Sequence, residues 1–199
     1  MTLSEVIRER RSISAFLDTP LPDGLVEELL EIAKWAPNHH LTQPWRFIYI
    51  TGEARRGLAE VRRILHQEAS KSPDPEQVRA VGERAYQTVM GIPAFLAVVM
   101  TEHEDPHVRE EDFAACCCLI QNFMLLAWER GIGTHWKTIS NDPRQRAFLG
   151  LAPNEKLVGF LHLGYPAKVP PPRERAPARE RITYIREVPR LKEDAHPAR

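Results

Sequence analysis

Residues 113–128, FAACCCLIQNFMLLAW, are apolar almost all the way round the helix that they would form. With their flanks they predict one long helix over residues 107–130, which Gly131 and Gly133 end. A surface helix keeps one polar face, and this segment has none at its centre. We therefore expect it to lie in the core or in a subunit interface, with the other elements arranged around it.

Three apolar runs predict core strands, at residues 45–51 (WRFIYIT), 94–101 (AFLAVVMT) and 156–166 (KLVGFLHLGYP). The second run is almost continuous, which is typical of a strand buried on both faces. The remaining periodic segments predict helices over residues 3–10, 23–36, 53–69, 76–90 and 141–150. Asp23 is the expected N-cap of the second helix, and Asn141 or Asp142 that of the last.

Strands alternate with helices, which predicts a three-layer α+β domain with about four core strands. That number is small for so long a central helix, so we expect a core completed by a second chain. The segment after Pro166 is rich in proline and charge and cannot form a core of its own. We therefore divide the chain into a domain at residues 1–166 and an extended arm at residues 167–199 that packs on the partner subunit.

The composition limits the class of protein. The chain has 199 residues and 27 residues of each charge, so a net charge of zero argues against a nucleic-acid-binding protein. No window approaches the length of a membrane span, and the charged N-terminus lacks the apolar stretch of an export signal. The adjacent cysteines 116–118 cannot form a disulfide framework or a zinc site. Buried thiols in the cytoplasm are the expected state.

The loop at residues 35–45, WAPNHHLTQPW, combines two tryptophans, two prolines and a pair of histidines. Adjacent side chains in an extended loop point in opposite directions, so His39 and His40 do not converge on one metal ion, and no metal site is expected. Pro37 and Pro44 stiffen the loop, which favours presentation of His39 to a planar ligand. An ordinary turn histidine is the alternative for His40.

Two further segments carry candidate binding residues. Arg10, Arg11 and Ser12 offer a dense set of donors for a phosphate, or else form only the solvated end of a helix. The segment GIGTHWKT at residues 131–138 is expected to turn out of the long helix. It then presents an indole, a cation and a hydroxyl, although Trp136 taken alone is more typical of a core residue. The glycine-rich phosphate loops and the nucleophile and metalloprotease motifs are absent from the sequence.

RRSISAF at residues 10–16, APNHHLTQPWRF at residues 36–47 and GIGTHW at residues 131–136 occur in that order. Together they resemble the FMN-dependent nitroreductase family, in particular its minimal, short bacterial branch, from about residue 4 to residue 166. The resemblance implies a three-layer sandwich whose mixed, mostly antiparallel sheet is flanked by helices. It also implies an intertwined homodimer with FMN at the subunit interface.

The resemblance implies roles for particular positions. Arg10, Arg11 and Ser12 match the motif that holds the phosphate and ribityl end of FMN. Trp35 and His39 match positions that reach the flavin from the other subunit. The segment beside the flavin ring is matched by Trp136, Lys137 and Thr138.

The sequence departs from the family pattern at two positions. Ser14 stands where many members have a lysine or arginine beside flavin N1, and Leu41 replaces an asparagine of the loop. Both departures bear on flavin potential and substrate polarity, and Lys137 is a candidate for the missing cation. The tail arginine that meets the phosphate in many members has several candidates here, including Arg173, Arg175 and Arg179.

The activity that the resemblance implies is an NAD(P)H oxidoreductase with ping-pong kinetics. NADH or NADPH would deliver hydride to flavin N5, and a nitroaromatic, quinone or similar electron-poor acceptor would then be reduced. We assign no catalytic side chain, although His39 is a candidate proton or hydrogen-bond donor near the ring. The alternatives are another reductive or flavin-modifying activity on the same fold, or a flavin-binding regulatory protein.

Overall fold

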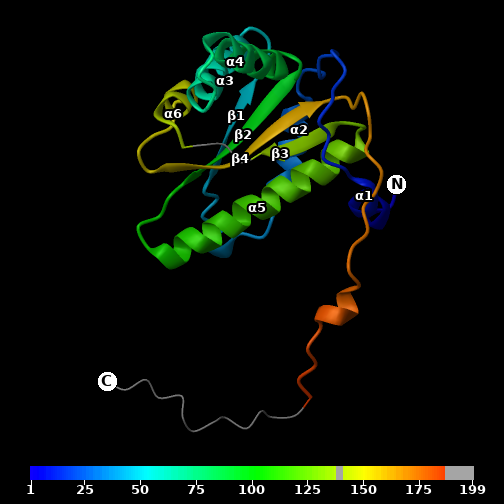
Figure 1. Ribbon diagram of the computed structural model, residues 1–199. Coiled ribbons are helices and arrows are strands. Elements are labelled where there is room, and N and C mark those ends of the chain that lie inside the picture. Colours follow the sequence, from blue (N-terminus) through cyan, green and yellow to red (C-terminus); the bar gives the residue numbers. More distant parts are fainter. Residues whose placement is uncertain (138–140, 187–199) are drawn as a thin grey trace.

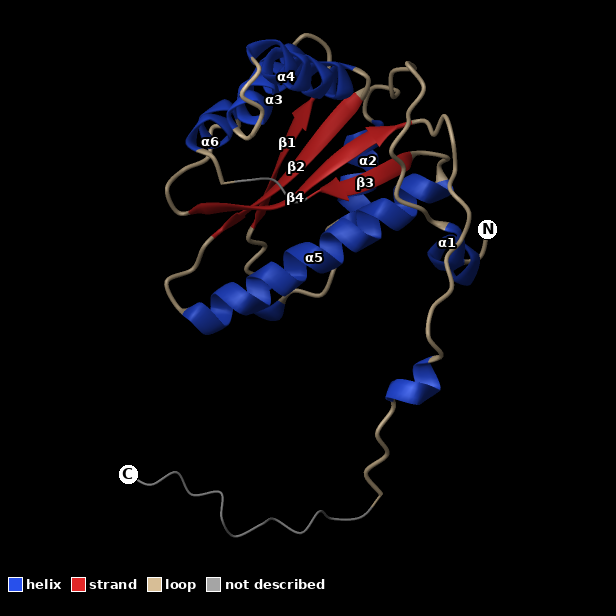
Figure 2. Cartoon of the chain, viewed as in Figure 1, coloured by secondary structure: helices blue, strands red, loops and turns tan. Residues whose placement is uncertain are grey.

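The computed structural model describes residues 1–137 and 141–186, which fold around one four-stranded sheet with helices on both faces (Figures 1 and 2). The strands are β1 (Trp45–Ile50), β2 (Ala94–Thr101), β3 (Gly133–Lys137) and β4 (Glu155–Gly164). The helices are α1 (Leu3–Glu9), α2 (Leu25–Ala33), α3 (Ala54–Glu68), α4 (Pro75–Met90), α5 (Pro106–Glu129) and α6 (Pro143–Phe148), with short 3-10 turns η1 (His39–Leu41) and η2 (Ala178–Arg181).

The strand order is β1-β2-β4-β3, and every neighbouring pair is antiparallel. One parallel bridge, between Ser12 and Thr134, extends the sheet beyond β3. The expected three-layer α+β sandwich with a mixed, mostly antiparallel sheet is therefore confirmed.

Strand β2 forms the centre of two separate apolar clusters. Its Leu96 and Val98 pack on one face with residues of α2 and α5. Its Phe95 and Ala97 pack on the opposite face with residues of α3 and α4 and the chain after α6. Both faces of the strand are thus buried, as its continuous apolar sequence predicts.

Three helices begin with the same Asp-Pro pair. The pairs are at residues 74–75, 105–106 and 142–143. Each aspartate accepts a hydrogen bond from the backbone N–H two residues further on, and each proline occupies the first helical position. The pair satisfies one orphan donor and removes another, because proline has no N–H. The boundaries of α4 and α5 therefore lie within one residue of those expected from sequence, whereas α6 is two residues shorter than expected at each end.

Three local predictions are wrong. Gly24, with φ of 77°, rather than Asp23, is the N-cap of α2, and its conformation favours glycine. The segment after α5 does not simply turn, because Gly133–Lys137 form the edge strand β3 along β4. Of the three free cysteines, Cys116 is buried but Cys118 is exposed.

The arm after β4 leaves the domain. The Ala167 N–H donates to the Ala15 carbonyl at 3.0 Å, and every residue from there to Arg186 is exposed. Figure 1 shows this segment running away from the helices and the sheet. Its apolar side chains include Ile182 and Ile185, which are 50% and 74% exposed. Across the described ranges, no helix is both long enough and apolar enough to cross a membrane.

Candidate functional site

The segment after α1 is held against the edge of the sheet. The Ile13 N–H donates to the Thr134 carbonyl at 3.0 Å, and Ser12 pairs with Thr134 in parallel. Ile13 is fully buried against Gly133, where an added Cβ would lie 2.7 Å from Ile13 Cγ1. The glycine thus allows the close approach that fixes the path of the chain through Arg10, Arg11 and Ser12.

The arginines at this edge form a cationic corner. Burial lowers the pKa of Arg10, and the positive charges of Arg11 and Arg175 lower it further. The Arg11 guanidinium donates to the carbonyls of Arg8 and Arg10, at 2.6 and 2.8 Å. Among the described residues, Arg10, Arg11 and Arg175 form no ion pair with a carboxylate. Three cations without a counter-charge favour an anion such as a phosphate.

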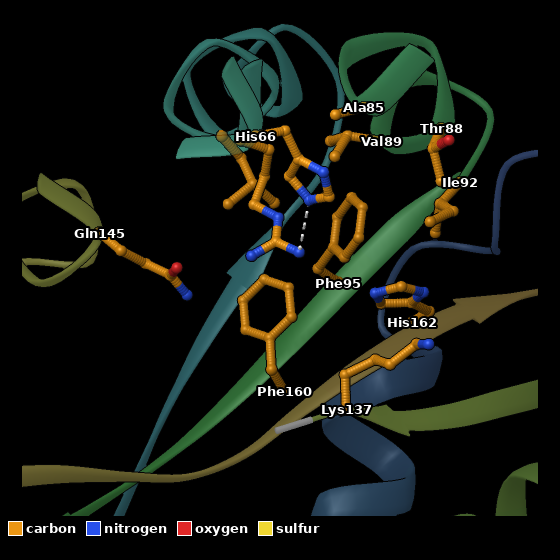
Figure 3. A pocket seen from close by; sticks show the side chains of 12 residues that line it. His66, Ala85, Thr88, Val89, Ile92, Phe95, Lys137, Gln145, Phe160 and His162 are labelled. Carbon is orange, nitrogen blue, oxygen red and sulfur yellow. Dashed lines mark hydrogen bonds between the residues drawn. The ribbon is translucent and has the colours of Figure 1, made fainter. Parts of the chain in front are cut away.

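A cavity of about 450 Å³ lies between the sheet and the layer of α3, α4 and α6 (Figure 3). The described residues that line it include basic and polar side chains but no aspartate or glutamate. They are Leu58, Arg62, His66, Ala85, Thr88, Val89, Ile92, Phe95, Lys137, Gln145, Phe160 and His162. Its volume falls in the range of small-molecule sites, and its mixture of aromatic walls and few polar groups is typical of them. The cavity is therefore a candidate binding site.

The histidines of the cavity favour their neutral forms. Burial lowers the pKa of His162 to about 3, and the charges of His135, Lys137 and Arg62 act in the same direction. Burial and Arg62 likewise lower the pKa of His66. The Arg62 guanidinium lies 3.5 Å from His66 Nε2, and a neutral ring can accept a hydrogen bond there. The positive charge of the cavity is thus concentrated on Arg62 and Lys137.

The residues at the end of β3 point to opposite faces of the sheet. The Lys137 side chain lines the cavity, whereas Trp136 packs against the cluster under α5. The latter side chain is therefore part of the core on the side away from the cavity. Thr138 lies outside the described residues.

The loop at residues 35–45 is fixed to the first half of α5. His39 Nδ1 lies 2.8 Å from Glu111 Oε2, and the Thr42 hydroxyl donates to buried Asp112 at 2.5 Å. His40, Leu41 and Gln43 have φ values of 53°, 53° and 44°, which are uncommon for side chains of this size. Trp35 remains 84% exposed. The loop is thus a shaped surface feature with an uncovered indole.

The cationic corner and this loop lie at opposite ends of α5 within one chain (Figure 1). The loop contacts Asp112 near the start of the helix, whereas Arg130 at its end leads directly into β3. At a rise of about 1.5 Å per residue, these positions are about 27 Å apart along the axis. One chain therefore does not bring His39 to Arg10 and Ser12.

Several cavity residues were not singled out from sequence, namely Arg62, His66, Gln145 and His162. Arg62 and His66 are one helical turn apart on α3, so the sequence alone predicts that they share one face of this helix. Gln145 and His162 carry no such signal, because only the folded chain brings α6 and β4 to the same cavity.

The comparisons with known proteins agree with this fold. Residues 7–165 match the sequence profile of the Nitroreductase family. YfhC of Bacillus subtilis (strain 168), provisionally named an NAD(P)H nitroreductase, is 40% identical over 185 residues, which cover 92% of this chain and 94% of the relative.

Two solved structures extend the likeness. A nitroreductase-like family protein from Bacillus cereus has a TM-score of 0.83 at 35% identity, over 94% of this chain and 97% of the other. A mutant of the FMN and NADPH-dependent nitroreductase NfnB from Sphigopyxis sp. strain HMH has a TM-score of 0.72 at 25% identity, over 92% and 99%. The fold and these matches define an oxidoreductase. The chain belongs to the nitroreductase family.

Proposed function

We propose that this protein is a homodimeric, FMN-dependent NAD(P)H oxidoreductase that reduces nitroaromatic, quinone or similar electron-poor acceptors. The observation that carries the proposal is the cationic corner of Arg10, Arg11 and Arg175 beside Ser12, which has no carboxylate partner among the described residues. The relative NfnB, described as FMN and NADPH-dependent, supports the choice of cofactor and donor.

The donors at the corner fit the phosphate of FMN. Arg10 and Arg11 would supply charged N–H groups, and Ser12 a hydroxyl, at the edge of β3. Of the tail arginines considered from sequence, we propose Arg175 as the phosphate ligand, because its charge acts on Arg10. The first part of the arm would then become ordered around the cofactor.

The ring end of the cofactor would lie toward Lys137 and Thr138. FMN held there would supply hydride and electron transfer between NADH or NADPH and the acceptor, and these residues would orient and tune it. Because Ser14 carries no charge, Lys137 is the candidate cation for the developing negative charge of the ring system. Reduction of a nitro to a nitroso group consumes two electrons and two protons and releases water. The nicotinamide supplies the electrons and one proton, and solvent supplies the other.

A second copy of the chain would complete the site. His39 of one subunit lies far from the cationic corner of the same subunit, so we propose that it meets the cofactor of the partner, together with the neighbouring Trp35. The exposed indole of Trp35 and the exposed apolar residues of the arm support such an interface. We further propose a cytoplasmic location, in keeping with three free thiols.

The absorption spectrum of the purified dimer tests the proposal. We expect flavin bands that bleach when NADH or NADPH is added anaerobically and return with a nitroaromatic or quinone. Arg10→Ala should release FMN, and Arg8→Ala on the exposed face of α1 is the matched control. A protein that neither contains nor takes up FMN would contradict the proposal, and so would bound flavin that neither nucleotide reduces.

A further inference from the structure

The cavity between α3, α4, α6 and the sheet contains a cation that no described group neutralises. Arg62 is half-buried, and among the described residues no carboxylate forms an ion pair with it. Its polar contact is the His66 ring nitrogen at 3.5 Å, marked by the dashed line in Figure 3. A partly desolvated guanidinium has unused donors in a planar fork, which matches a carboxylate.

Gln145 is a second unpartnered group in the same cavity. It is 1% exposed, and among the described residues neither its Oε1 nor its Nε2 has a hydrogen-bond partner. In Figure 3 its amide points toward the cavity from α6, while Lys137 and His162 enter from the sheet. A buried amide without partners is costly and uncommon, so a ligand that bonds to it accounts for its orientation.

The position of Gln145 is fixed from outside the cavity. Asp142 caps α6 and also pairs with Arg144, which in turn forms a bidentate contact with Glu68 of α3 at 2.7 Å. These contacts tie α6 to α3, the helix that carries Arg62. The amide and the guanidinium are therefore held on neighbouring, mutually anchored helices, as a preorganised site requires.

The remaining walls of the cavity are apolar and partly aromatic. The rings of Phe95 and Phe160 lie with their centroids 5.4 Å apart at 30°. Val89 and Ile92 border the same space. Aromatic walls of this kind favour a flat ring, because aromatic pairs gain both buried area and favourable ring contacts. The site thus combines a carboxylate-binding fork with a surface for a ring.

We propose that the cavity binds an aromatic monocarboxylate, whose carboxylate meets Arg62 and Gln145 and whose ring lies against Phe95 and Phe160. Lys137 lines the same cavity and adjoins the segment proposed to border the flavin, so the anion is a substrate, an acceptor of the nitrobenzoate type. Its role as substrate rests on the proposed function, whereas binding of the anion does not.

Calorimetric titration of the holoenzyme with benzoate, which contains no reducible group, tests binding. We expect saturable binding that weakens by about 10- to 100-fold in Arg62→Met, the range that loss of a charged hydrogen bond implies. Arg62→Lys keeps the positive charge but lacks the planar fork of donors, so its affinity for benzoate should lie between those of the wild type and Arg62→Met. Arg56→Met is the matched control, because Arg56 is on the same helix, exposed, and paired with Glu53.

Steady-state rates test the role as substrate. For the wild type, kcat/KM should be higher for 4-nitrobenzoate than for 4-nitrobenzamide. We expect Arg62→Met and Gln145→Leu to reduce that ratio about tenfold or more, with FMN affinity unchanged.

Two results would overturn the inference. The first is absence of benzoate binding in a holoenzyme that turns over. The second is an Arg62→Met protein that releases FMN and loses both substrates equally, which would assign the cavity to the flavin ring. Failure of the proposed function looks different, because the wild type itself would then bind no FMN or would hold flavin that neither nucleotide reduces.

Discussion

Arg46 of β1 and Glu155 of β4 are joined by two hydrogen bonds, of 2.5 and 2.7 Å, across the end of β2. The side chain of Glu155 is 10% exposed and also accepts from the Ala152 N–H. This pair connects strands that are not neighbours in the sheet, and it lowers the pKa of Glu155 to about 2.

We expect this pair to contribute to acid sensitivity. The pKa of Glu155 is lower in the folded than in the unfolded state, so its stabilisation is complete above about pH 4.5 and is lost as pH falls toward 2. At pH 3 the loss from this group is about 2 kcal/mol. Urea unfolding of the wild type and Glu155→Gln across pH 3–7 measures it. Parallel pH profiles for the two proteins would contradict the assignment.

Glycine is required at position 159 because the Trp136 indole and Ile120 cover it. A Cβ at 159 would lie 2.6 Å from Ile120 Cδ1 and 3.0 Å from Trp136 Nε1. Gly159→Ala is expected to lower the free energy of unfolding by about 1–3 kcal/mol through overpacking. Gly91→Ala, where the added atom would lie 3.4 Å from the Gln87 carbonyl oxygen, is the control and should change stability little. Equal stability of the two variants would mean that Ile120 and Trp136 can shift to accommodate the added methyl group at little cost.

His162 should make stability fall between pH 7 and 5. Burial lowers its pKa to about 3 in the folded chain. As the pH falls, the unfolded chain therefore binds a proton at this residue near pH 6.5, whereas the folded chain stays neutral there. The resulting loss is about 2 kcal/mol at pH 5. In His162→Gln this part of the pH dependence should disappear, measured by urea unfolding at pH 7 and pH 5. NMR titration of the ring with a midpoint above pH 6 would contradict the prediction.

The sheet was largely predictable because β1, β2 and β4 are apolar runs. β3 was missed because Gly133–Lys137 has short, mixed residues, and its strand conformation comes from pairing with β4. Gly24 took the cap position from Asp23 because the turn needs a positive φ there. Local sequence therefore predicts an element well where burial decides it and poorly where the neighbouring chain does.

The candidate site was predictable only where its residues are contiguous. Arg10 to Ser12 and Lys137 were chosen as short motifs, and the structure places both at or next to the edge strand β3. Arg62 and Gln145 come from helices that are far apart in sequence, so no motif joins them. The separation of His39 from Arg10 likewise follows from the length of α5 rather than from either motif.

The tail arginines offer a direct test of the proposed phosphate site. The charge of Arg175 acts on Arg10, whereas no such effect from Arg173 or Arg179 accompanies it. Arg175→Ala is therefore expected to weaken FMN binding about 10-fold or more, the size of one charged hydrogen bond. Fluorescence titration of apoprotein with FMN measures it, with Arg179→Ala as the control. A larger effect from Arg179 would assign the phosphate contact to Arg179 instead of Arg175.

His39 tests whether the loop takes part in the reaction or only shapes the surface. Its ring is bonded to Glu111, which holds the pKa of that carboxyl below its usual value. If His39 donates a proton near the partner's flavin, His39→Ala should reduce turnover about 100-fold with little change in FMN affinity. Glu111→Gln retains an acceptor for the ring and should reduce turnover far less. Unchanged turnover and FMN affinity in His39→Ala would remove the role. Equal losses in both variants, together with weaker FMN binding, would mean that the His39–Glu111 contact serves to hold the loop on α5.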